Sequence, residues 1–229
     1  MQQLALALAP PPEPTFDSFF PARNAGALRA LQDALDGGER FIYLWGPRGA
    51  GKSHLLRAFV SEAAARGSAA RYCRAEERIE GSGAGGGAVS AFAVDDADRL
   101  DMVGQLALFD LFNRLRTGTG TLLTAGTRPP VELPLREDLR TRIGAGVVLR
   151  LEPLTDEEKA AAISEHGRRR GLALAPDLIE YLLRHATRDM GTQMAVVDTL
   201  DRVSLERKRP LTLPLLREVL RLLEARPPA

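Results

Sequence analysis

The segment Gly46–Ser53, with the sequence GPRGAGKS, constrains the fold more than any other part of the chain. It fits the pattern G-x-x-x-x-G-K-[ST], in which glycines let backbone N–H groups turn inward around phosphate oxygens. The apolar run Phe41–Trp45 precedes it, and the helical stretch Lys52–Ala65 follows it. Because this pattern requires a strand before the loop and a helix after it, the sequence predicts a phosphate-binding loop at this point.

Polar residues in and beyond this loop have expected roles in binding a nucleotide. Lys52 would reach the β- and γ-phosphates, and the Ser53 hydroxyl would hold Mg²⁺. Asp95 and Asp96 end a later apolar run, and an acid at the carboxyl end of a parallel strand points into the ligand crevice. Asp95 would then bind Mg²⁺ through water, and Asp96 could polarise an attacking water. The alternative for both is an acidic cap of the next helix.

Alternating apolar and amphipathic segments predict the fold class. Short apolar runs typical of strands lie at 41–45, 70–74, 91–94, 121–125 and 146–151. Strands that alternate with helices imply an α/β fold whose parallel sheet is covered on both faces. After residue 153 the strand signals stop, and helices are expected at 155–170, 176–187, 192–207 and 213–225; Thr155 and Glu158 form a capping box for the first. We expect a flexible arm at 1–14, an α/β domain at 15–152 and an all-helical domain at 153–229.

Composition narrows the functional classes. The chain has 31 basic and 30 acidic residues, so its net charge of +1 gives no general reason to coat nucleic acid or an anionic membrane. It has no apolar run of about 18 residues that could span a membrane. Cys73 is the only cysteine and the three histidines are scattered, which excludes Cys–His metal chemistry and favours a reducing, cytoplasmic setting. The basic clusters 168–170 and 207–209 are best explained as solvated helix ends.

Four further polar residues are ambiguous from spacing alone. Thr127 ends the fourth apolar run and could place a hydroxyl near the γ-phosphate, but a turn threonine before a Pro-Pro pair is nearly as well supported. Arg140 and Arg142 come just before the fifth run, and Arg188 ends a predicted helix. Each arginine would be solvated by default, so spacing does not choose among them.

Several segments together resemble the DnaA-related AAA+ family, and more closely its short Hda-type members. They are TFDSFF (15–20), GKSHLL (51–56), VDDAD (94–98), LFDLFNR (108–114), LLTAGTRPP (122–130), DLRTRIGAG (138–146), EPLTDEEK (152–159) and RDM (188–190). The resemblance covers about residues 15–225, and the RPP and RTR segments are its most selective parts. It implies a P-loop AAA+ domain with a five-stranded parallel sheet, followed by a small all-α lid.

By position, the resemblance assigns Thr127 to sensor 1, Arg188 to sensor 2 and Arg142 to an arginine finger that acts in a neighbour's nucleotide site. Phe16, Phe20 and Asn24 lie where the family builds part of its base pocket. The implied nucleotide contacts are Gly46, Arg48, Gly49, Ala50, Gly51, Lys52, Ser53, His54, Thr127 and Arg188. The implied ligand is ADP or ATP with Mg²⁺. The initiator DnaA has an acid where Thr127 stands, so we expect little ATPase activity from this chain itself.

The N-terminal arm contains the hexapeptide QLALAL (3–8), which is similar to the peptides that dock onto the replication sliding clamp. Gln3 would bind a polar subsite, and Leu4, Leu6 and Leu8 would fill apolar ones. From the residues alone, a disordered tail or a strand added to the sheet is the better explanation. The resemblance shifts the expectation to clamp docking.

The resemblance therefore implies a negative regulator of bacterial replication initiation. Such a protein would dock on the DNA-loaded sliding clamp (the β subunit of DNA polymerase III) and stimulate ATP hydrolysis by DnaA through Arg142. It would be cytoplasmic and associated with the nucleoid through the clamp, and it would contact no membrane. Two alternatives stay open: an AAA+ ATPase that assembles with itself and uses Asp96 and Arg142, and a helicase-loader-type recruiter that binds DNA. Whether the free chain is a monomer or a homodimer also stays open.

Overall fold

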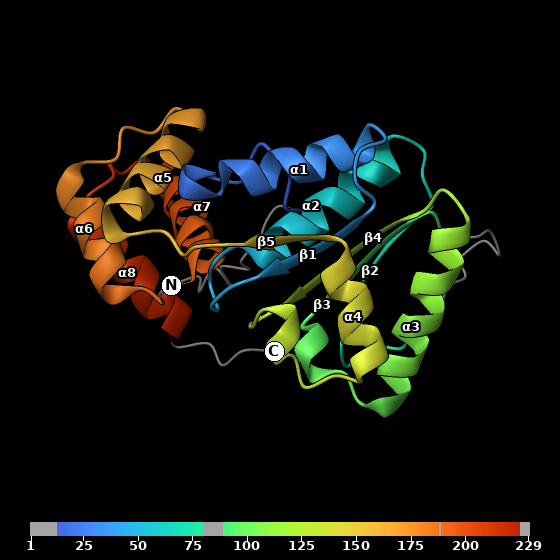
Figure 1. The fold of residues 1–229 in the computed structure, drawn as a ribbon. Coiled ribbons are helices and arrows are strands. Elements are labelled where there is room, and N and C mark those ends of the chain that lie inside the picture. Colours follow the sequence, from blue (N-terminus) through green and yellow to red (C-terminus); the bar gives the residue numbers. More distant parts are fainter. Residues whose placement is uncertain (1–12, 80–88, 188, 225–229) are drawn as a thin grey trace. The chain divides into compact units, whose positions relative to one another are not determined.

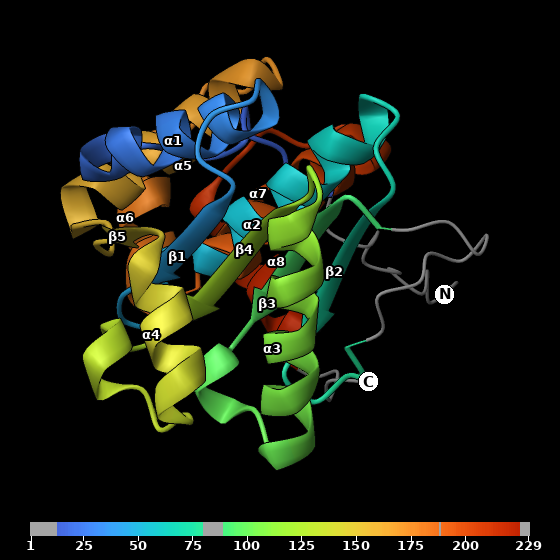
Figure 2. The same cartoon turned by 45° about the vertical axis from the view of Figure 1, so that its right-hand side comes forward.

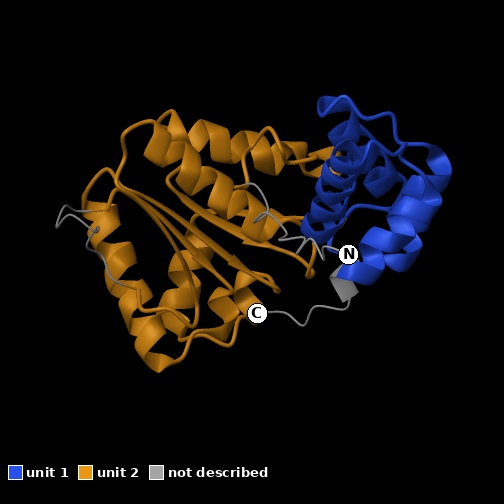
Figure 3. Cartoon of the chain, turned by 180° about the vertical axis from the view of Figure 1, so that it is seen from behind, with its two compact units in different colours: residues 1–12, 154–229 blue, residues 13–153 orange. Residues whose placement is uncertain are grey.

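The computed structural model describes residues 13–79, 89–187 and 189–224 of the 229-residue chain. Contacts between Cα atoms divide the chain into two compact units, one spanning Glu13–Pro153 and the other containing the residues from Leu154 onward (Figure 3). Each unit has its own apolar core, and we describe them in turn.

The first unit alternates strands with helices. Its elements are η1 Ala22–Asn24, α1 Ala25–Leu35, β1 Phe41–Trp45, α2 Lys52–Ala65, β2 Ala70–Arg74, β3 Ala91–Asp95, η2 Ala97–Arg99, α3 Met102–Thr117, β4 Thr121–Gly126, η3 Pro130–Glu132, α4 Glu137–Ala145 and β5 Val147–Arg150 (Figure 1). Every strand coincides with one of the predicted apolar runs to within one residue at each end, so the predicted strands are confirmed.

The five strands form one sheet in the order β2-β3-β4-β1-β5, and every neighbouring pair is parallel. Trp45 at the end of β1 lies opposite Gly126 at the end of β4, and Asp95 ends the neighbouring strand β3. Because all strands point the same way, the loops that follow β1, β3 and β4 emerge at one edge of the sheet. The predicted parallel sheet is confirmed, and this edge positions the candidate site.

Helices cover both faces of the sheet, as Figures 1 and 2 show from two directions. On one face, Leu31 of α1 and Phe59 of α2 are fully buried in a core with the side chains of β1 and β4. On the other face, Leu108 of α3 and Leu139 of α4 are fully buried against Phe92 of β3. Burying one such side chain contributes about 1.5–3 kcal/mol relative to exposing it, so these contacts fix the sheet and its loops.

The second unit contains four helices: α5 Asp156–Arg169, α6 Pro176–His185, α7 Met190–Arg207 and α8 Leu213–Glu224. Their core includes Ile163, Val197 and Val219, each at most 1% exposed. The predicted capping box is confirmed: the Glu158 N–H donates to the Thr155 hydroxyl at 3.2 Å, and the Thr155 N–H donates to the Glu158 carboxylate at 2.7 Å.

The third of these helices begins earlier than the sequence predicts. We expected a start at Thr192, but α7 begins at Met190 because the Asp189 side chain caps it. The Thr192 N–H donates to Asp189 Oδ2 at 2.8 Å, which satisfies a backbone donor that has no partner within the helix. Within the described residues, no helix has the length and apolar character needed to cross a membrane.

Candidate functional site

The loop between β1 and α2 has the backbone shape that a phosphate-binding loop requires. Gly46, Gly49 and Gly51 have φ angles of 151°, 80° and 95°, a region that L side chains rarely adopt. A Cβ on Gly46 would lie 2.2 Å from the carbonyl oxygen of Leu151, and one on Gly51 would lie 2.7 Å from the ring of Phe19. The loop therefore needs glycine at both positions, for conformation and for space.

Lys52, the first residue of α2, lies across this loop. It is 7% exposed, and its Nζ donates hydrogen bonds to the carbonyl oxygens of Gly46 at 2.8 Å and Pro47 at 3.0 Å. Burial lowers the pKa of the Lys52 ammonium, while Asp95, Asp96 and Asp98 oppose this shift. The ammonium thus lies against the loop, and the three carboxylates at the end of the sheet favour its charged form. Ser53 is exposed at the same helix terminus.

Asp95 is held firmly in place at the end of β3. It is 1% exposed, and its Oδ2 accepts a hydrogen bond from the Tyr72 hydroxyl at 2.8 Å. Its Oδ1 accepts from the backbone N–H of Asp96 at 3.0 Å. A carboxylate oriented in this way can accept a further hydrogen bond from a metal-bound water.

Asp96 follows with an unusual backbone, because its φ of 52° and ψ of 39° are left-handed. Its side chain makes no capping hydrogen bond to η2, so the alternative of an acidic cap is wrong for this residue. Burial raises the pKa of Asp96, and the nearby charges of Asp95 and Asp98 raise it further. Such a carboxyl is a better proton acceptor than an ordinary aspartate.

Asp98 is a site residue to which the sequence analysis assigned no role. The Thr127 hydroxyl donates to Asp98 Oδ2, and the Thr127 N–H donates to the same oxygen at 3.3 Å. Nearby, the Tyr43 hydroxyl donates to the carbonyl oxygen of Arg128 at 2.6 Å, which fixes the start of the turn after β4. Because a hydroxyl has one proton, Thr127 in this geometry gives it to Asp98. In the sequence, the only sign of this role of Asp98 is that it is the third acidic residue at the end of β3 and just after it.

His54 contacts the segment that precedes α1. Its Nε2 lies 2.9 Å from the Thr15 carbonyl oxygen and 3.2 Å from the Ser18 hydroxyl. Its ring lies 5.6 Å from the ring of Phe19, which is the aromatic side chain that covers Gly51. Burial lowers the pKa of His54, and the Thr15 carbonyl opposes this shift. His54 therefore fastens the 15–19 segment over the phosphate-binding loop.

Asn24, expected to help form a base pocket, is also used in packing. Its Nδ2 donates to the Glu152 carbonyl oxygen at 2.8 Å, and its Oδ1 accepts from the Glu152 N–H at 2.9 Å. Both ends of the amide are thus bonded to the backbone just after β5. Arg23 adds an ion pair to the Glu152 side chain at 2.8 Å.

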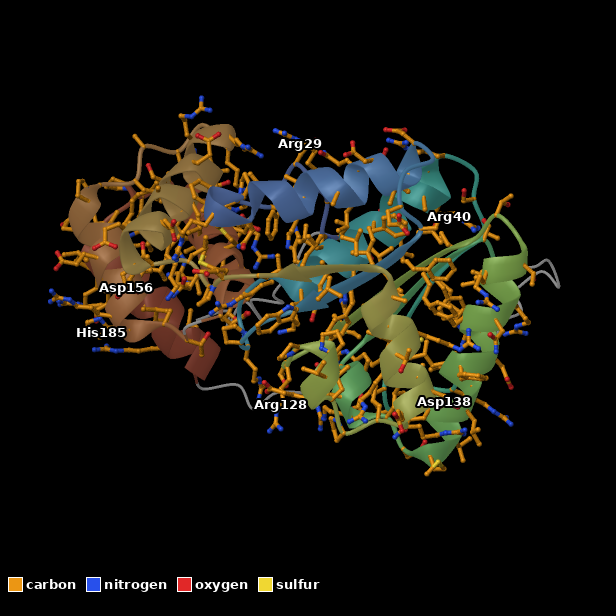
Figure 4. All side chains as sticks on the ribbon, in the orientation of Figure 1. Arg29, Arg40, Arg128, Asp138, Asp156 and His185 are labelled. Atoms are coloured by element: carbon orange, nitrogen blue, oxygen red, sulfur yellow. The ribbon has the colours of Figure 1, made fainter. Side chains whose placement is uncertain are left out.

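Arg142 lies on α4, away from the phosphate-binding loop. Its guanidinium carbon stands 4.4 Å from the centre of the Phe109 ring and 5.5 Å from that of Phe112. These side chains line a groove of about 1020 Å³ together with Asp138, which is labelled in Figure 4. Asp138 forms its ion pair with Arg136, at 2.8 Å. Within the described part of the chain, neither Arg142 nor Arg140 forms an ion pair. A guanidinium that lies over a ring keeps its N–H donors at its edge, so Arg142 can still bind an anion.

The residues around the loop fit a nucleotide with Mg²⁺. Mg²⁺ binds oxygen atoms and takes one or two protein ligands together with water and substrate phosphates. The Ser53 hydroxyl and the Asp95 carboxylate supply oxygens of this kind. A site made of protein side chains alone is a different case: the described residues contain no group of three His, Cys, Asp or Glu side chains that could hold a metal. Arg188, Gln3, Leu4, Leu6 and Leu8 lie outside the described residues.

Comparison with known proteins shows the class of this fold. Residues 156–220 match the family model of the Hda lid domain. Domain III of DnaA from Thermotoga maritima superposes with a TM-score of 0.71 at 19% identity, over 95% of this chain and 98% of that one. AMPPCP-bound DnaA from Aquifex aeolicus gives 0.69 at 24% identity, over 86% of this chain and 68% of that one. A RuvB variant from Thermotoga maritima gives 0.62 at 17% identity, over 92% and 73%.

The parallel sheet, the glycine-rich loop before α2 and the helical second unit give the chain the fold of the P-loop AAA+ class. Within that class, the match of residues 156–220 to the Hda lid domain and the DnaA-like fold support an Hda-type, DnaA-related AAA+ protein. The resemblance seen in the sequence is thereby confirmed. The second unit is called the lid below.

Proposed function

We propose that this chain is a negative regulator of replication initiation that promotes ATP hydrolysis by the initiator DnaA. The observation that carries the proposal is the placement of Arg142 over Phe109 and Phe112, beside an open groove and without an ion pair among the described residues. An arginine placed against a neighbour's γ-phosphate stabilises transition-state charge and can raise hydrolysis about 10³–10⁵-fold. In this role the chain supplies charge to its partner's reaction.

The chain's own site would bind ADP or ATP with Mg²⁺. Lys52 and the loop N–H groups would hold the phosphates, while Ser53 and, through water, Asp95 would hold the ion. Thr127 gives its hydroxyl proton to Asp98, and Asp96 has a shorter side chain than the glutamate of many ATPases. Both features favour slow hydrolysis in this site. Bound nucleotide would then serve to stabilise the protein in the form that meets DnaA.

Docking onto the sliding clamp would use Gln3, Leu4, Leu6 and Leu8. Burying three leucines contributes about 5–9 kcal/mol before any cost is subtracted. Ordering six residues costs about 1–2 kcal/mol each, so the peptide alone should bind weakly. A ring-shaped clamp with repeated sites raises the effective concentration, and DNA would be reached through the clamp. The same docking would associate the protein with the nucleoid.

The direct test follows the hydrolysis of DnaA-bound ATP while the chain, the clamp and DNA are added singly and together. We expect strong stimulation only when all three are present, because the clamp on DNA concentrates the chain near its target. No stimulation by the full mixture, or full stimulation without the clamp, would contradict the proposal.

A second candidate is an AAA+ ATPase that assembles with itself. The raised pKa of Asp96 favours it, because such a carboxyl can accept a proton from an attacking water. In that case, Arg142 of one copy would act in the site of the next. ATP turnover by the purified chain alone, rising steeply with its own concentration, would support this candidate over the first.

A further inference from the structure

The lid gathers arginines from two separate segments around one groove. Arg209, just after α7, and Arg217 and Arg221 of α8 line a groove of about 570 Å³, together with Pro214, Glu218 and Leu222. Arg207 and Lys208 come directly before Arg209 at the end of α7. The sequence presents these residues as an isolated basic cluster and an amphipathic helix. The fold joins them into one cationic surface, which we call the α8 groove.

The positive charge of this groove is only partly neutralised within the lid. Between positions 202 and 222 there are six basic residues and two acidic ones. Glu218 serves two arginines at once, because it accepts from Arg207 and, at 3.1 Å, from Arg209. Arg217 and Arg221 form no ion pair within the described residues. Like charges placed close together repel, so an anionic ligand would be favoured here.

The other basic cluster of the lid differs in this respect. Arg168 pairs with Glu165 at 2.7 Å, and Arg170 pairs with Asp198 at 3.2 Å and with Asp201 at 3.3 Å. These arginines fit the expectation of solvated helix ends, since local acids already balance them. The α8 groove fits the expectation of solvated helix ends less well, because the arginines of the groove outnumber the acidic residues beside them.

Arg217 is also oriented by an aromatic side chain. Its guanidinium carbon lies 5.1 Å from the centre of the Tyr181 ring, and that ring stacks on His185 at 3.8 Å with an interplanar angle of 12°. His185 is exposed on α6 (Figure 4). A guanidinium placed over a ring keeps its N–H donors at the edge, where they can bond two oxygens of one phosphate. Arg221 lies one helical turn further along the same face.

We propose that the α8 groove binds the phosphate backbone of duplex DNA without reading its bases. Planar guanidinium groups match phosphate geometry, and contacts to phosphate carry no sequence information. Duplex DNA is the favoured ligand because it carries one negative charge per about 1.7 Å of axis, so a groove with several cations releases the most counterions on it. Sequence-independent binding of this kind has a Kd of about 10⁻⁴–10⁻⁶ M at physiological salt. This inference does not depend on the proposed function.

The test measures anisotropy of a fluorescein-labelled duplex of about 30 base pairs, titrated with the full chain at several salt concentrations. Each phosphate contact contributes about 0.9 to the slope of log K against log [salt] on duplex DNA. The double variant R217A/R221A should therefore bind more weakly and show a slope smaller by about 1.8. Because Arg217 packs on Tyr181, the single variant R221A provides a check that leaves this contact intact. Its slope should fall by about 0.9.

The matched control is R66A/R168A, which removes two exposed arginines that already have acidic partners, at 2.6 Å for Arg66–Asp36 and 2.7 Å for Arg168–Glu165. It has the same net charge as R217A/R221A and should bind DNA like the wild type. Equal losses in both double variants, or an unchanged slope in R221A, would overturn the proposal. Tighter binding to a single-stranded oligonucleotide, or equally effective competition by polyglutamate, would overturn the assignment to duplex DNA. No clamp or DnaA is present, so this test can fail while the proposed function stands.

Discussion

At the scale of single residues, Lys52 is the side chain on which nucleotide binding should depend most. Its buried ammonium lies against the phosphate-binding loop, and a hydrogen bond from a charged donor contributes about 1.5–3 kcal/mol. We therefore expect Lys52→Ala to weaken Mg-ADP binding by about 10- to 150-fold in calorimetric titration. Arg29→Ala, which removes an exposed cation from α1, should bind like the wild type. Near-normal affinity of the Lys52 variant would show that the loop does not hold phosphates.

The stability of the folded protein should depend on pH through Asp96, because burial and the charges of Asp95 and Asp98 raise the pKa of this carboxyl. A carboxyl with a raised folded-state pKa favours folding while it is protonated, and this contribution is lost as pH rises through that pKa. Asp96→Asn should therefore unfold at a higher temperature at about pH 7, and the gain should vanish near about pH 3. Solvent screening limits the gain to about 1–3 °C.

Thermal unfolding of both proteins across this pH range checks the Asp96 prediction. Asparagine tolerates the left-handed backbone at position 96, so the substitution itself adds little strain. The pair between Asp96 and Arg99, at 3.9 Å, is too long and exposed to offset the gain. A variant that is less stable than the wild type at neutral pH would mean that the Asp96 charge is favourable in the folded protein.

At the scale of elements, the turn between β1 and α2 depends on its first glycine. A side chain at position 46 would collide with the backbone at Leu151, whose N–H is bonded to the Trp45 carbonyl at 2.7 Å. Gly46→Ala should therefore lower the free energy of unfolding by at least about 2 kcal/mol and weaken nucleotide binding tenfold or more. Urea unfolding and ADP titration measure the two effects.

Gly67→Ala is the control for the conformational part of this effect. Gly67 has a φ of 83° at the end of α2, but nothing lies within 4 Å of the position of a new Cβ. Its substitution should cost only the strain of the left-handed backbone, about 1–2 kcal/mol, and leave nucleotide affinity unchanged. Equal nucleotide affinities for the two variants would contradict the close approach inferred at Gly46.

The elements that sequence reasoning identified are those with a continuous signal. Each strand is a short apolar run, and α2 and the lid helices lie in the helical stretches that the sequence predicts. The helices α1 and α4 were not predicted. The sequence of α4, EDLRTRIGA, buries only Leu139 and Ile143, one turn apart, so it shows little periodicity.

The candidate site was predictable to the extent that it is continuous in the sequence. The phosphate-binding loop and the acids after β3 are local patterns, and both lie at the predicted edge of the sheet. The bond between Thr127 and Asp98 joins residues 29 positions apart, and it depends on the placement of β3 beside β4. The stacking of Arg142 on Phe109 joins α4 to α3 in the same way. Contacts of this kind follow from packing, which no local pattern encodes.

At the scale of the whole molecule, the two units carry different parts of the proposed function. The α/β unit holds both the phosphate-binding loop and Arg142, on different elements, so the chain can bind its own nucleotide and still offer a guanidinium to another protein. The lid carries the match to the Hda family and the cationic α8 groove. The proposed function uses the phosphate-binding loop and Arg142, and the α8 groove would add a separate, direct contact to DNA.

The measurement that tests this account most directly compares Arg142→Ala with Arg140→Ala in the hydrolysis of DnaA-bound ATP, with clamp and DNA present. Both substitutions remove an arginine from α4 that has no ion pair among the described residues, so they match in charge and location. Since an arginine finger supplies about 10³–10⁵-fold, Arg142→Ala should abolish stimulation while nucleotide and clamp binding stay normal, and Arg140→Ala should stimulate like the wild type. Normal stimulation by the Arg142→Ala protein would contradict the account.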